Sequence, residues 1–546
     1  MKPINRTLSE IQNNHTLFKL ECWDRMFFTW RFPMLMSEGG AAVAIKRVFN
    51  VVVAVSFIFK PLRDMLVNRM SELAAEHETD VIWLPSTNQK KDEIATEYLE
   101  KFHATKKEEG VVCIVKAQEK QRVLGTRTEK ATDGTDRKRA SLYFTKNMVN
   151  QYYVYFWDKD WGLGFVKLSS YAPFGGNLYV NGHEYVKRQL EQRGIGYEAL
   201  ENGLKSCQRP EVLPGIVSEI GSDSIRRLFR KWTLGVIKHP VINRLKRHNV
   251  RYEIYMTQME YARTSIWDNG KRGLEFFEQL IRENLDIGRP ETAGLIFKKR
   301  ATKKVLSCWK FMTQVVTEKV IPVFKFRFKS NIMKLYLKCG IGLRLEAMMN
   351  NPRDLGVRTT LTERNFAELR EKGMGIISRT EGQIKLSHDP TIAAEKLIEL
   401  ETSQVKEGRR IGGIRRSSER DRELLNCLLK LSYIGTGITN ESLREQMNAV
   451  GEKKYTSGQI SYHLRKLKEK EVLKKVEGKN RYEMTKTGMH LALFITRVEK
   501  RVYREGMGTL LSGEDWGPSK ETKKVKEQVK RVDDLIGKMM ENMNAA

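Results

Sequence analysis

The sequence predicts an α+β protein of several domains. Its 546 residues exceed what one hydrophobic core ordinarily serves, so we expect roughly three or four domains. Hydrophobic residues make up 40% of the chain and aromatic residues 9%, which is enough to build packed cores. Segments with period-two apolar patterning and segments with helical periodicity both occur, so strands and helices are both expected.

Charge is the strongest compositional signal. The chain has 97 lysines and arginines against 67 aspartates and glutamates, a net charge of +30. An excess of this size predicts a polyanionic partner, because each neutralised phosphate releases counterions. DNA is the partner that we expect, with RNA as the alternative and an anionic membrane surface as the competing explanation.

The cysteines and one apolar segment bear on the compartment. The six cysteines include no C-x-x-C pair, which argues against zinc fingers and against a secreted disulfide framework. We therefore expect reduced thiols in a cytoplasmic protein. The apolar run at residues 48–59 is shorter than the roughly twenty residues of a membrane-spanning helix, so it predicts a buried strand or helix and no membrane association.

The order of elements divides the chain into successive regions. Residues 1–75 carry no assignable pattern. Residues 76–145 predict an N-terminal βαβ unit with parallel strands, from "DVIWLP", "KKDEIATEYLEKF" and "GVVCIVKAQE". The charged segment 126–141 within that region is expected to be a mobile loop. A central domain with a mixed sheet and helices follows at 146–405, then a basic linker at 406–422, a further domain at 423–512 and a charged tail at 513–546.

Within the central domain, residues 149–195 predict strand, turn, strand, strand and helix. Residues 210–300 predict mainly helices, one of them capped by Ser222. Residues 321–350 alternate apolar and basic side chains, the pattern of half-buried strands, and this places Lys325, Arg327 and Lys329 on one face.

The clearest functional pattern lies at residues 418–500. "SERDRELLNCLLKLSY", "TNESLREQMNAV" and "TSGQISYHLRKLKEKEVL" predict three helices, and "LKKVEGKNRYEMT" predicts a hairpin with "EGKN" at its tip. This order resembles the winged helix–turn–helix domains of DNA-binding regulators. The resemblance implies that the third helix enters a major groove and that the hairpin contacts the backbone or the minor groove.

The third helix and the hairpin carry the predicted nucleic-acid contacts. Leu464 and Leu467 are expected to face the core, and residues 461–480 hold seven basic residues against three acidic ones. The side chains predicted to contact nucleic acid are Ser457, Gln459, Ser461, Tyr462, Arg465, Lys466, Lys468, Lys479 and Arg481. The function that this favours is DNA binding, in regulating or maintaining a mobile or replicating element. The alternative is that the domain binds protein or only packs against the rest of the chain.

A second hypothesis concerns "VYFWDKDWGLGFVKLSSY", residues 154–171. Three strands and a helix with an acid at the end of the first strand are similar to the start of RNase H-like nucleases and transposases. That resemblance implies a site for two divalent metals, Mg²⁺ or Mn²⁺, held by Asp158, Glu184 and a downstream acid such as Asp286, Glu346 or Asp354. "DKDWG" with Asp160 also satisfies the chemistry of a hairpin turn, which we favour, so no cofactor is predicted outside this alternative.

Other polar residues of the central domain predict structural roles. His183 is expected to be an ordinary polar or capping residue, and Lys187 and Arg188 a basic helix face. Arg344 and Glu346 are expected to form an ion pair at the edge of a basic sheet. The order Y-F-x-D, G-F-x-K and N-G-H-E-x-x-K-R-Q is similar to that of uncharacterised microbial proteins and implies no function.

Overall fold

The computed structural model describes residues 12–52, 55–85, 91–130, 138–271, 273, 276–277, 311–318, 321–388, 394–406, 408–415, 418–429, 433, 437–450 and 454–498. The chain is a mixed α/β protein of more than one domain, as predicted in outline. Its contacts divide it into two units. The sheet unit comprises Thr16–Asp268 and Ser330–Ile377, and the second unit comprises the rest, including Ser378 onward.

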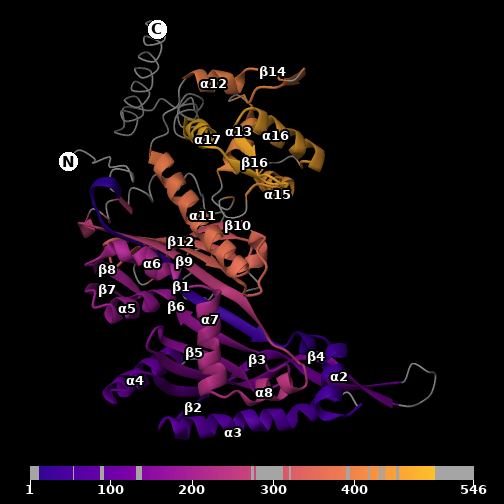
Figure 1. The fold of residues 1–546 in the computed structure, drawn as a ribbon. Coiled ribbons are helices and arrows are strands. Elements are labelled where there is room, and N and C mark those ends of the chain that lie inside the picture. Colours follow the sequence, from indigo (N-terminus) through magenta and orange to yellow (C-terminus); the bar gives the residue numbers. More distant parts are fainter. Residues whose placement is uncertain are drawn as a thin grey trace, which may run out of the picture. The chain divides into compact units, whose positions relative to one another are not determined.

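One large mixed sheet forms the centre of the sheet unit (Figure 1). Within this unit the strand order is β12-β13-β9-β1-β6-β5-β4-β3-β2, so the N-terminal strand β1 lies in the middle between β6 and β9. All neighbouring pairs from β13 to β3 are antiparallel, and β2 with β3 is parallel. The strands are β1 (Thr16–Arg31), β2 (Val81–Leu84), β3 (Gly110–Lys130), β4 (Lys138–Asp158), β5 (Gly162–Ser169), β6 (Gly176–Asn181), β9 (Glu253–Trp267), β12 (Asn331–Lys338) and β13 (Gly342–Met349), with β7 (Tyr197–Leu200) and β8 (Gly203–Cys207) as a separate hairpin.

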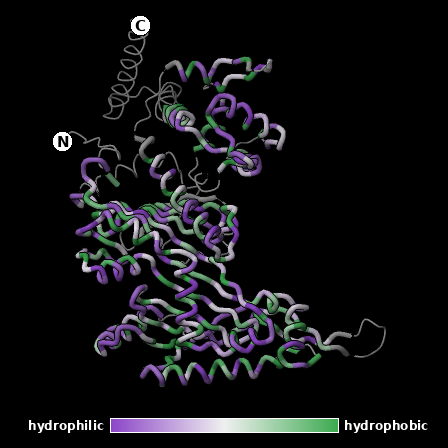
Figure 2. The backbone as a smooth tube through the Cα atoms, in the orientation of Figure 1, coloured by the Kyte–Doolittle hydropathy of each residue, from purple (hydrophilic) through white to green (hydrophobic). Residues whose placement is uncertain are grey.

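Helices cover both faces of this sheet. The α-helices are α2 (Glu38–Phe49), α3 (Lys60–Glu76), α4 (Lys91–Ala104), α5 (Gly182–Gln192), α6 (Leu213–Ser218), α7 (Ser222–Phe229), α8 (Pro240–Arg247) and the first part of α11 (Glu363–His388). Shorter turns are η1 (Pro33–Met36), η2 (Ser56–Phe59), η3 (Pro210–Val212), η4 (Arg230–Val236) and η5 (Pro352–Leu355). Figure 2 shows hydrophilic and hydrophobic residues alternating along α3, as an amphipathic covering helix requires.

Buried aromatic side chains fix the layers on the two faces. On one face, Trp232 of η4 stacks on Phe156 of β4 with ring centroids 4.3 Å apart, and Trp30 of β1 packs against Phe229 of α7. On the other face, α4 closes a cluster that includes Phe102 and Tyr155. Strand β4 therefore presents aromatic residues on both faces, as a strand that is covered on both sides does.

Several predicted elements are confirmed. β2, α4 and β3 form the βαβ unit, with Val81 paired in parallel to Ile114. β4 and β5 form the predicted hairpin around residues 159–161, followed by β6 and α5. β12 and β13 form strands over part of residues 321–350, and on β11 (Ile321–Phe328), Lys325 and Arg327 alternate with buried phenylalanines as expected.

The prediction for residues 48–59 is wrong. Helix α2 ends at Phe49, because Asn50 takes a left-handed conformation (φ 55°) and caps it. Val48 and Phe59 are buried, but Val52 is 84% exposed and Phe57, in η2, is 73% exposed, so the described residues of the run do not form one buried strand or one buried helix; residues 53–54 lie outside the described residues. An apolar composition without a matching period does not fix burial.

Two other predictions are corrected by the sheet. Most of the segment 126–141 belongs to strands, because β3 and β4 continue their pairing to Lys130 opposite Lys138; residues 131–137 lie outside the described residues. That pairing also crosses the boundary placed at 145/146. The region 210–300 contains β9, a strand and not a helix, and its C-terminal half is buried on both faces and so lacks alternation. The cap of α7 is Gly221, with Ser222 as the first helical residue.

The second unit contains the C-terminal helices. Its elements are β10 (Phe311–Glu318), β11, the end of α11, α12 (Ala394–Glu401), β14 (Gln404–Lys406), β15 (Arg409–Ile411), α13 (Glu419–Leu428), α15 (Asn440–Val450), α16 (Ser457–Glu469), β16 (Leu473–Lys475), β17 (Tyr482–Met484) and α17 (Lys486–Val498). The predicted linker at 406–422 therefore includes β15, which pairs with β14. The predicted tail at 513–546 lies outside the described residues.

Candidate functional site

The carboxylate of Asp158 is part of a structural turn. It is 1% exposed, and its Oδ1 accepts hydrogen bonds from the backbone N–H groups of Asp160 (2.9 Å) and Trp161 (3.1 Å). Its Oδ2 accepts from Lys231 Nζ (2.7 Å) and Trp232 Nε1 (2.8 Å). Four donors occupy this carboxylate, so it closes the β4–β5 hairpin and ties it to η4, as the turn interpretation expects.

The other proposed metal ligands do not join it. Glu184 accepts from Lys187 Nζ at 2.7 Å, and Asp160 accepts from the side chain of Gln192. Asp286 lies outside the described residues. Within the parts of the chain that are described, no group of three His, Cys, Asp or Glu side chains could hold a metal ion. The residues described do not fit the two-metal site, and the nuclease alternative stays an untested prediction.

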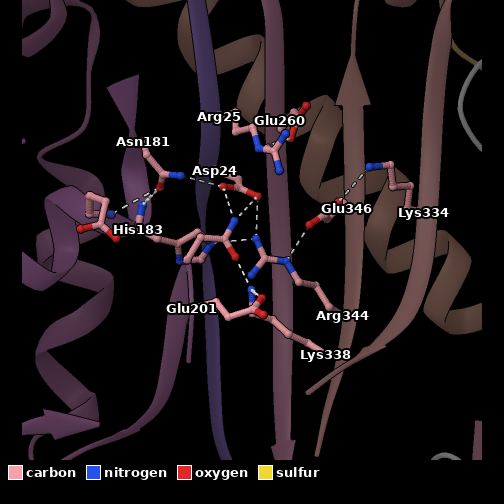
Figure 3. A network of polar contacts seen from close by, with 12 residues as sticks. Asp24, Arg25, Asn181, His183, Glu201, Glu260, Lys334, Lys338, Arg344 and Glu346 are labelled. Atoms are coloured by element: carbon pink, nitrogen blue, oxygen red, sulfur yellow. Dashed lines mark hydrogen bonds and ion pairs between the residues drawn. The ribbon is translucent and has the colours of Figure 1, made fainter. Parts of the chain in front are cut away.

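A buried polar network lies at the middle of the sheet; the sequence did not single out Asp24, Asn181 or Asn202, and it predicted other roles for His183, Arg344 and Glu346. We call it the Asp24 network (Figure 3). Arg344 Nη2 donates to Asp24 Oδ2 at 2.6 Å, and Arg344 Nε donates to Glu346 Oε1 at 2.8 Å. Asn181 and Asn202 each donate to Asp24 Oδ1 at 3.1 Å. Asp24 comes from β1, Arg344 and Glu346 from β13, and Asn181 from the end of β6, so the network links β1 to its neighbour β6 and, across β9, to β13.

The network also sets the start of helix α5. Asn181 Oδ1 accepts from the backbone N–H of His183 (2.8 Å), so one amide both caps the helix and binds Asp24. His183 is fully buried, and its Nε2 lies 3.3 Å from Arg344 Nη2. Because a guanidinium can only donate, this nitrogen must accept, and the ring is neutral. Burial and the neighbouring Arg344 charge hold the pKa of His183 well below its usual value.

A second carboxyl group, Glu260 of β9, lies beside the network. It is 1% exposed, and Arg25 Nε approaches its Oε2 to only 3.9 Å. Burial and the nearby charge of Asp24 raise the pKa of Glu260 to about 7. The sheet thus buries three carboxyl groups near one another. Asp24 and Glu346 are hydrogen-bonded to Arg344, whereas Glu260 has a raised pKa.

Three predictions are corrected by this arrangement. Arg344 and Glu346 are not an edge pair, because β13 lies inside the sheet and Arg344 is fully buried. His183 lies next to the cap and takes part in the network. Lys187 does not belong to a solvated basic face: its ammonium donates to Glu184 and to the carbonyl of Glu201 at 2.6 Å. A charged residue in the middle of an apolar strand, as in "LECWDRMFF", is the one signal that could have pointed to Asp24.

In the second unit, residues 418–498 form helices α13, α15 and α16, then the β16–β17 hairpin and helix α17. Thr456 and Gln459 form a capping box at the start of α16. Asn440, at the start of α15, donates to the carbonyl of Ser457 and to the hydroxyl of Ser461, both at 2.8 Å. These contacts fix α16 against α15. Gly478 (φ 67°) lies in the predicted "EGKN" tip.

Most of the predicted contact residues are exposed, and the others are partly or fully buried. Leu464 and Leu467 are buried, as predicted. The exposed side chains of α16 and the hairpin include Ser457, Gln459, Ser461, Tyr462, Arg465, Lys468, Lys474, Lys475 and Lys479, together with Glu477 and Asn480. Arg481 is half-buried. Two of the exposed cations have acidic neighbours: Lys468 Nζ lies 3.3 Å from Glu469 Oε1, and Lys474 Nζ lies 3.5 Å from Glu483 Oε2.

Lys466 does not belong to the exposed residues of that set. It is 5% exposed, and its Nζ lies 3.3 Å from Asp421 Oδ2 of α13. Burial lowers the pKa of Lys466, and the carboxylate of Asp421 opposes that shift. The ion pair with Asp421 directs the side chain of Lys466 toward α13, so this lysine joins α16 to α13 and is not available to a ligand.

No known protein family matches the chain, and no curated protein and no solved structure does either. In the described part of the chain, no helix has both the length and the apolarity needed to cross a membrane.

Proposed function

We propose that the protein binds nucleic acid, with duplex DNA as the expected ligand, through helix α16 and the β16–β17 hairpin. The observation that carries the proposal is the exposure of several polar and basic side chains on α16 and on the hairpin that follows it. Arg465 and Lys468 lie on the helix, and Lys474, Lys475 and Lys479 lie on the hairpin, all exposed. Side chains of this kind bind phosphates and base edges.

The shape of the segment supports the same conclusion. α16 has thirteen residues, a length that a major groove accommodates, and its outer face carries Ser457, Ser461 and the half-exposed Tyr462. The buried Lys466–Asp421 ion pair and the Asn440 contacts hold the helix in a fixed position against α13 and α15. A rigid scaffold behind an exposed helix is what recognition by docking requires. We propose a winged helix domain on this basis.

The test is the salt dependence of binding to a labelled duplex of mixed sequence, measured by fluorescence anisotropy. The change is Arg465→Ala together with Lys479→Ala. We expect affinity to fall about tenfold or more, with a salt slope smaller by about 2, because two phosphate contacts are lost. Both side chains are exposed, so thermal stability is expected to stay unchanged.

A matched control removes the same two charge types elsewhere. Arg244 and Lys246 are exposed on α8 in the sheet unit. The Arg244→Ala, Lys246→Ala variant is expected to keep the affinity within about twofold. Equal losses in the two variants, or no loss in the first, would contradict the proposal that α16 and the hairpin form the interface.

A further inference from the structure

An open groove in the sheet unit combines exposed apolar side chains with basic ones. It has a volume of about 630 Å³ and lies between η2, the start of α3, and the β3–β4 ribbon. We call it the Phe57 groove, and its lining includes Phe57, Lys60, Arg63, Leu124, Met148 and Tyr171. Its volume falls in the range of pockets that hold small organic groups.

The groove has a fixed apolar floor and exposed apolar walls. Phe59 and Phe174 form the floor, both buried, with ring centroids 5.8 Å apart. Phe57 is 73% exposed and Met148 is 59% exposed, whereas Tyr171 is 38% exposed. Apolar side chains this exposed lose the stabilisation of burial unless a ligand covers them, so a cluster of them beside a recess marks a binding surface.

Positive charge surrounds these apolar groups. Lys60 and Arg63 lie on the α3 side, with Asp64 as their acidic neighbour at 3.3 and 2.9 Å, and the Arg63 guanidinium lies 5.7 Å from the centre of the Tyr171 ring. A cation over an aromatic ring forms a flat, positively charged surface, which suits stacking by an aromatic ligand that also carries negative charge.

The β3–β4 ribbon adds a second group of cations. Arg122 lies directly opposite Lys146, and Lys120 lies directly opposite Met148. Because side chains alternate along a strand, these residues share the face of Leu124 and Met148, which line the groove. Like charges directly opposite one another destabilise a strand pair, and a bound polyanion removes that repulsion. The excess of charge is therefore complementary to a phosphate backbone.

We propose that the Phe57 groove binds single-stranded nucleic acid, with one or two unpaired bases against Phe57 and Tyr171 and the phosphates beside the cations of α3 and the ribbon. The inference rests on the proposed function, since it takes nucleic acid as the partner. A single strand fits better than a duplex because only an unpaired base offers its face to a ring. A recess with a closed aromatic floor also fits an inserted base better than a flat lipid surface.

The test uses the full chain and a labelled oligothymidylate of ~15 nucleotides, with a labelled duplex measured in parallel. Phe57→Ala is expected to weaken binding of the single strand between about fivefold and a hundredfold, the loss of one stacked base. Binding of the duplex is expected to stay unchanged. Leu17, in β1 and 71% exposed, gives the matched control, and Leu17→Ala is expected to change neither affinity.

The outcomes separate this proposal from the one for α16. If the Arg465→Ala, Lys479→Ala variant binds the duplex normally while Phe57→Ala still weakens binding of the single strand, the groove stands and the α16 interface fails. Single-strand binding that Phe57→Ala leaves within twofold of the wild type overturns the groove. Phe57-dependent binding to phosphatidylserine vesicles or to an acidic peptide, with no binding of the oligothymidylate, overturns it as well.

Discussion

Replacing Arg344 with methionine is expected to lower the free energy of unfolding of the sheet unit by about 3–5 kcal/mol, the range for breaking a buried ion pair from one side. The side chain is fully buried and bonds to two carboxylates, Asp24 at 2.6 Å and Glu346 at 2.8 Å. Methionine has a similar volume and no charge. The loss of stability therefore measures the cost of leaving two buried carboxylates without their cation.

The hydrogen bonds that Asp24 and Glu346 retain determine how far the free energy of unfolding falls. Asp24 keeps the amides of Asn181 and Asn202, while Glu346 keeps the hydroxyl of Tyr336 (2.6 Å) and the more distant Lys334 (3.7 Å). Each charge-assisted hydrogen bond contributes about 1.5–3 kcal/mol, so losing two of them agrees with the stated range. The residual donors keep the loss from exceeding it.

Thermal unfolding measured by tryptophan fluorescence is the assay. At about 2 °C per kcal/mol for a unit of this size, the midpoint is expected to fall by roughly 6–10 °C. Arg209→Met is the matched control, because Arg209 forms an exposed ion pair with Glu211 and is expected to shift the midpoint by less than about 2 °C.

A triple variant tests the mechanism of that loss. Asp24→Asn and Glu346→Gln, added to Arg344→Met, remove both orphaned charges and are expected to restore at least about 2 kcal/mol. A drop for Arg344→Met no larger than that of Arg209→Met, or a triple variant less stable than the single one, would refute the reasoning.

Three further expectations follow from other buried charges. Burial raises the pKa of Glu260 to about 7 from an ordinary value of 4.5, so the folded protein holds a proton that the unfolded chain releases, and stability falls as pH rises from about 4.5 to 7. In Glu260→Gln the thermal unfolding midpoint, measured from pH 5 to 8, should no longer fall in this way. Identical pH profiles for the variant and the wild type would contradict the assignment. Asp158→Ala is expected to cost about 2–4 kcal/mol in thermal unfolding and Asp160→Ala less than about 1 kcal/mol; equal losses would argue against the turn assignment. Lys466→Met is expected to weaken hydrogen-exchange protection of α13 and α16 by about 2–4 kcal/mol, whereas Lys468→Met, at an exposed position, leaves it unchanged. If both variants changed the protection equally, the burial of Lys466 would be contradicted.

The spacing of apolar and turn residues predicted those helices and strands that pack against elements close to them in the sequence. The β4–β5 hairpin, α5 and the βαβ unit each show their period and their turn residues within a short window. Strand β9 was missed because both of its faces are buried in its second half, which removes the alternation that marks a strand.

The Asp24 network could not be found in this way. Its central bond joins Asp24 and Arg344, 320 positions apart, and no local pattern carries that information. Lys466 was assigned to the wrong face for a related reason: lysine is a surface residue by composition, and only its partner on α13, Asp421, explains why it is buried. Burial of charge depends on partners brought together by the fold.

The central place of β1 also sets the order in which the protein can fold during synthesis. β1 is made before its partners β6 and β9, and β13 follows only after residues 269–329. At about 5–20 residues per second, β1 leaves the ribosome roughly 10–45 s before β9. Until β6 has been made, Trp23, Phe28 and Trp30 have no sheet to pack into, and until β9 has been made one edge of β1 stays unpaired; an unpaired apolar strand is a site of aggregation. Strand β1 therefore needs protection from aggregation during that interval, and a fragment ending before Glu253 leaves the edge of β1 that pairs with β9 permanently unpaired.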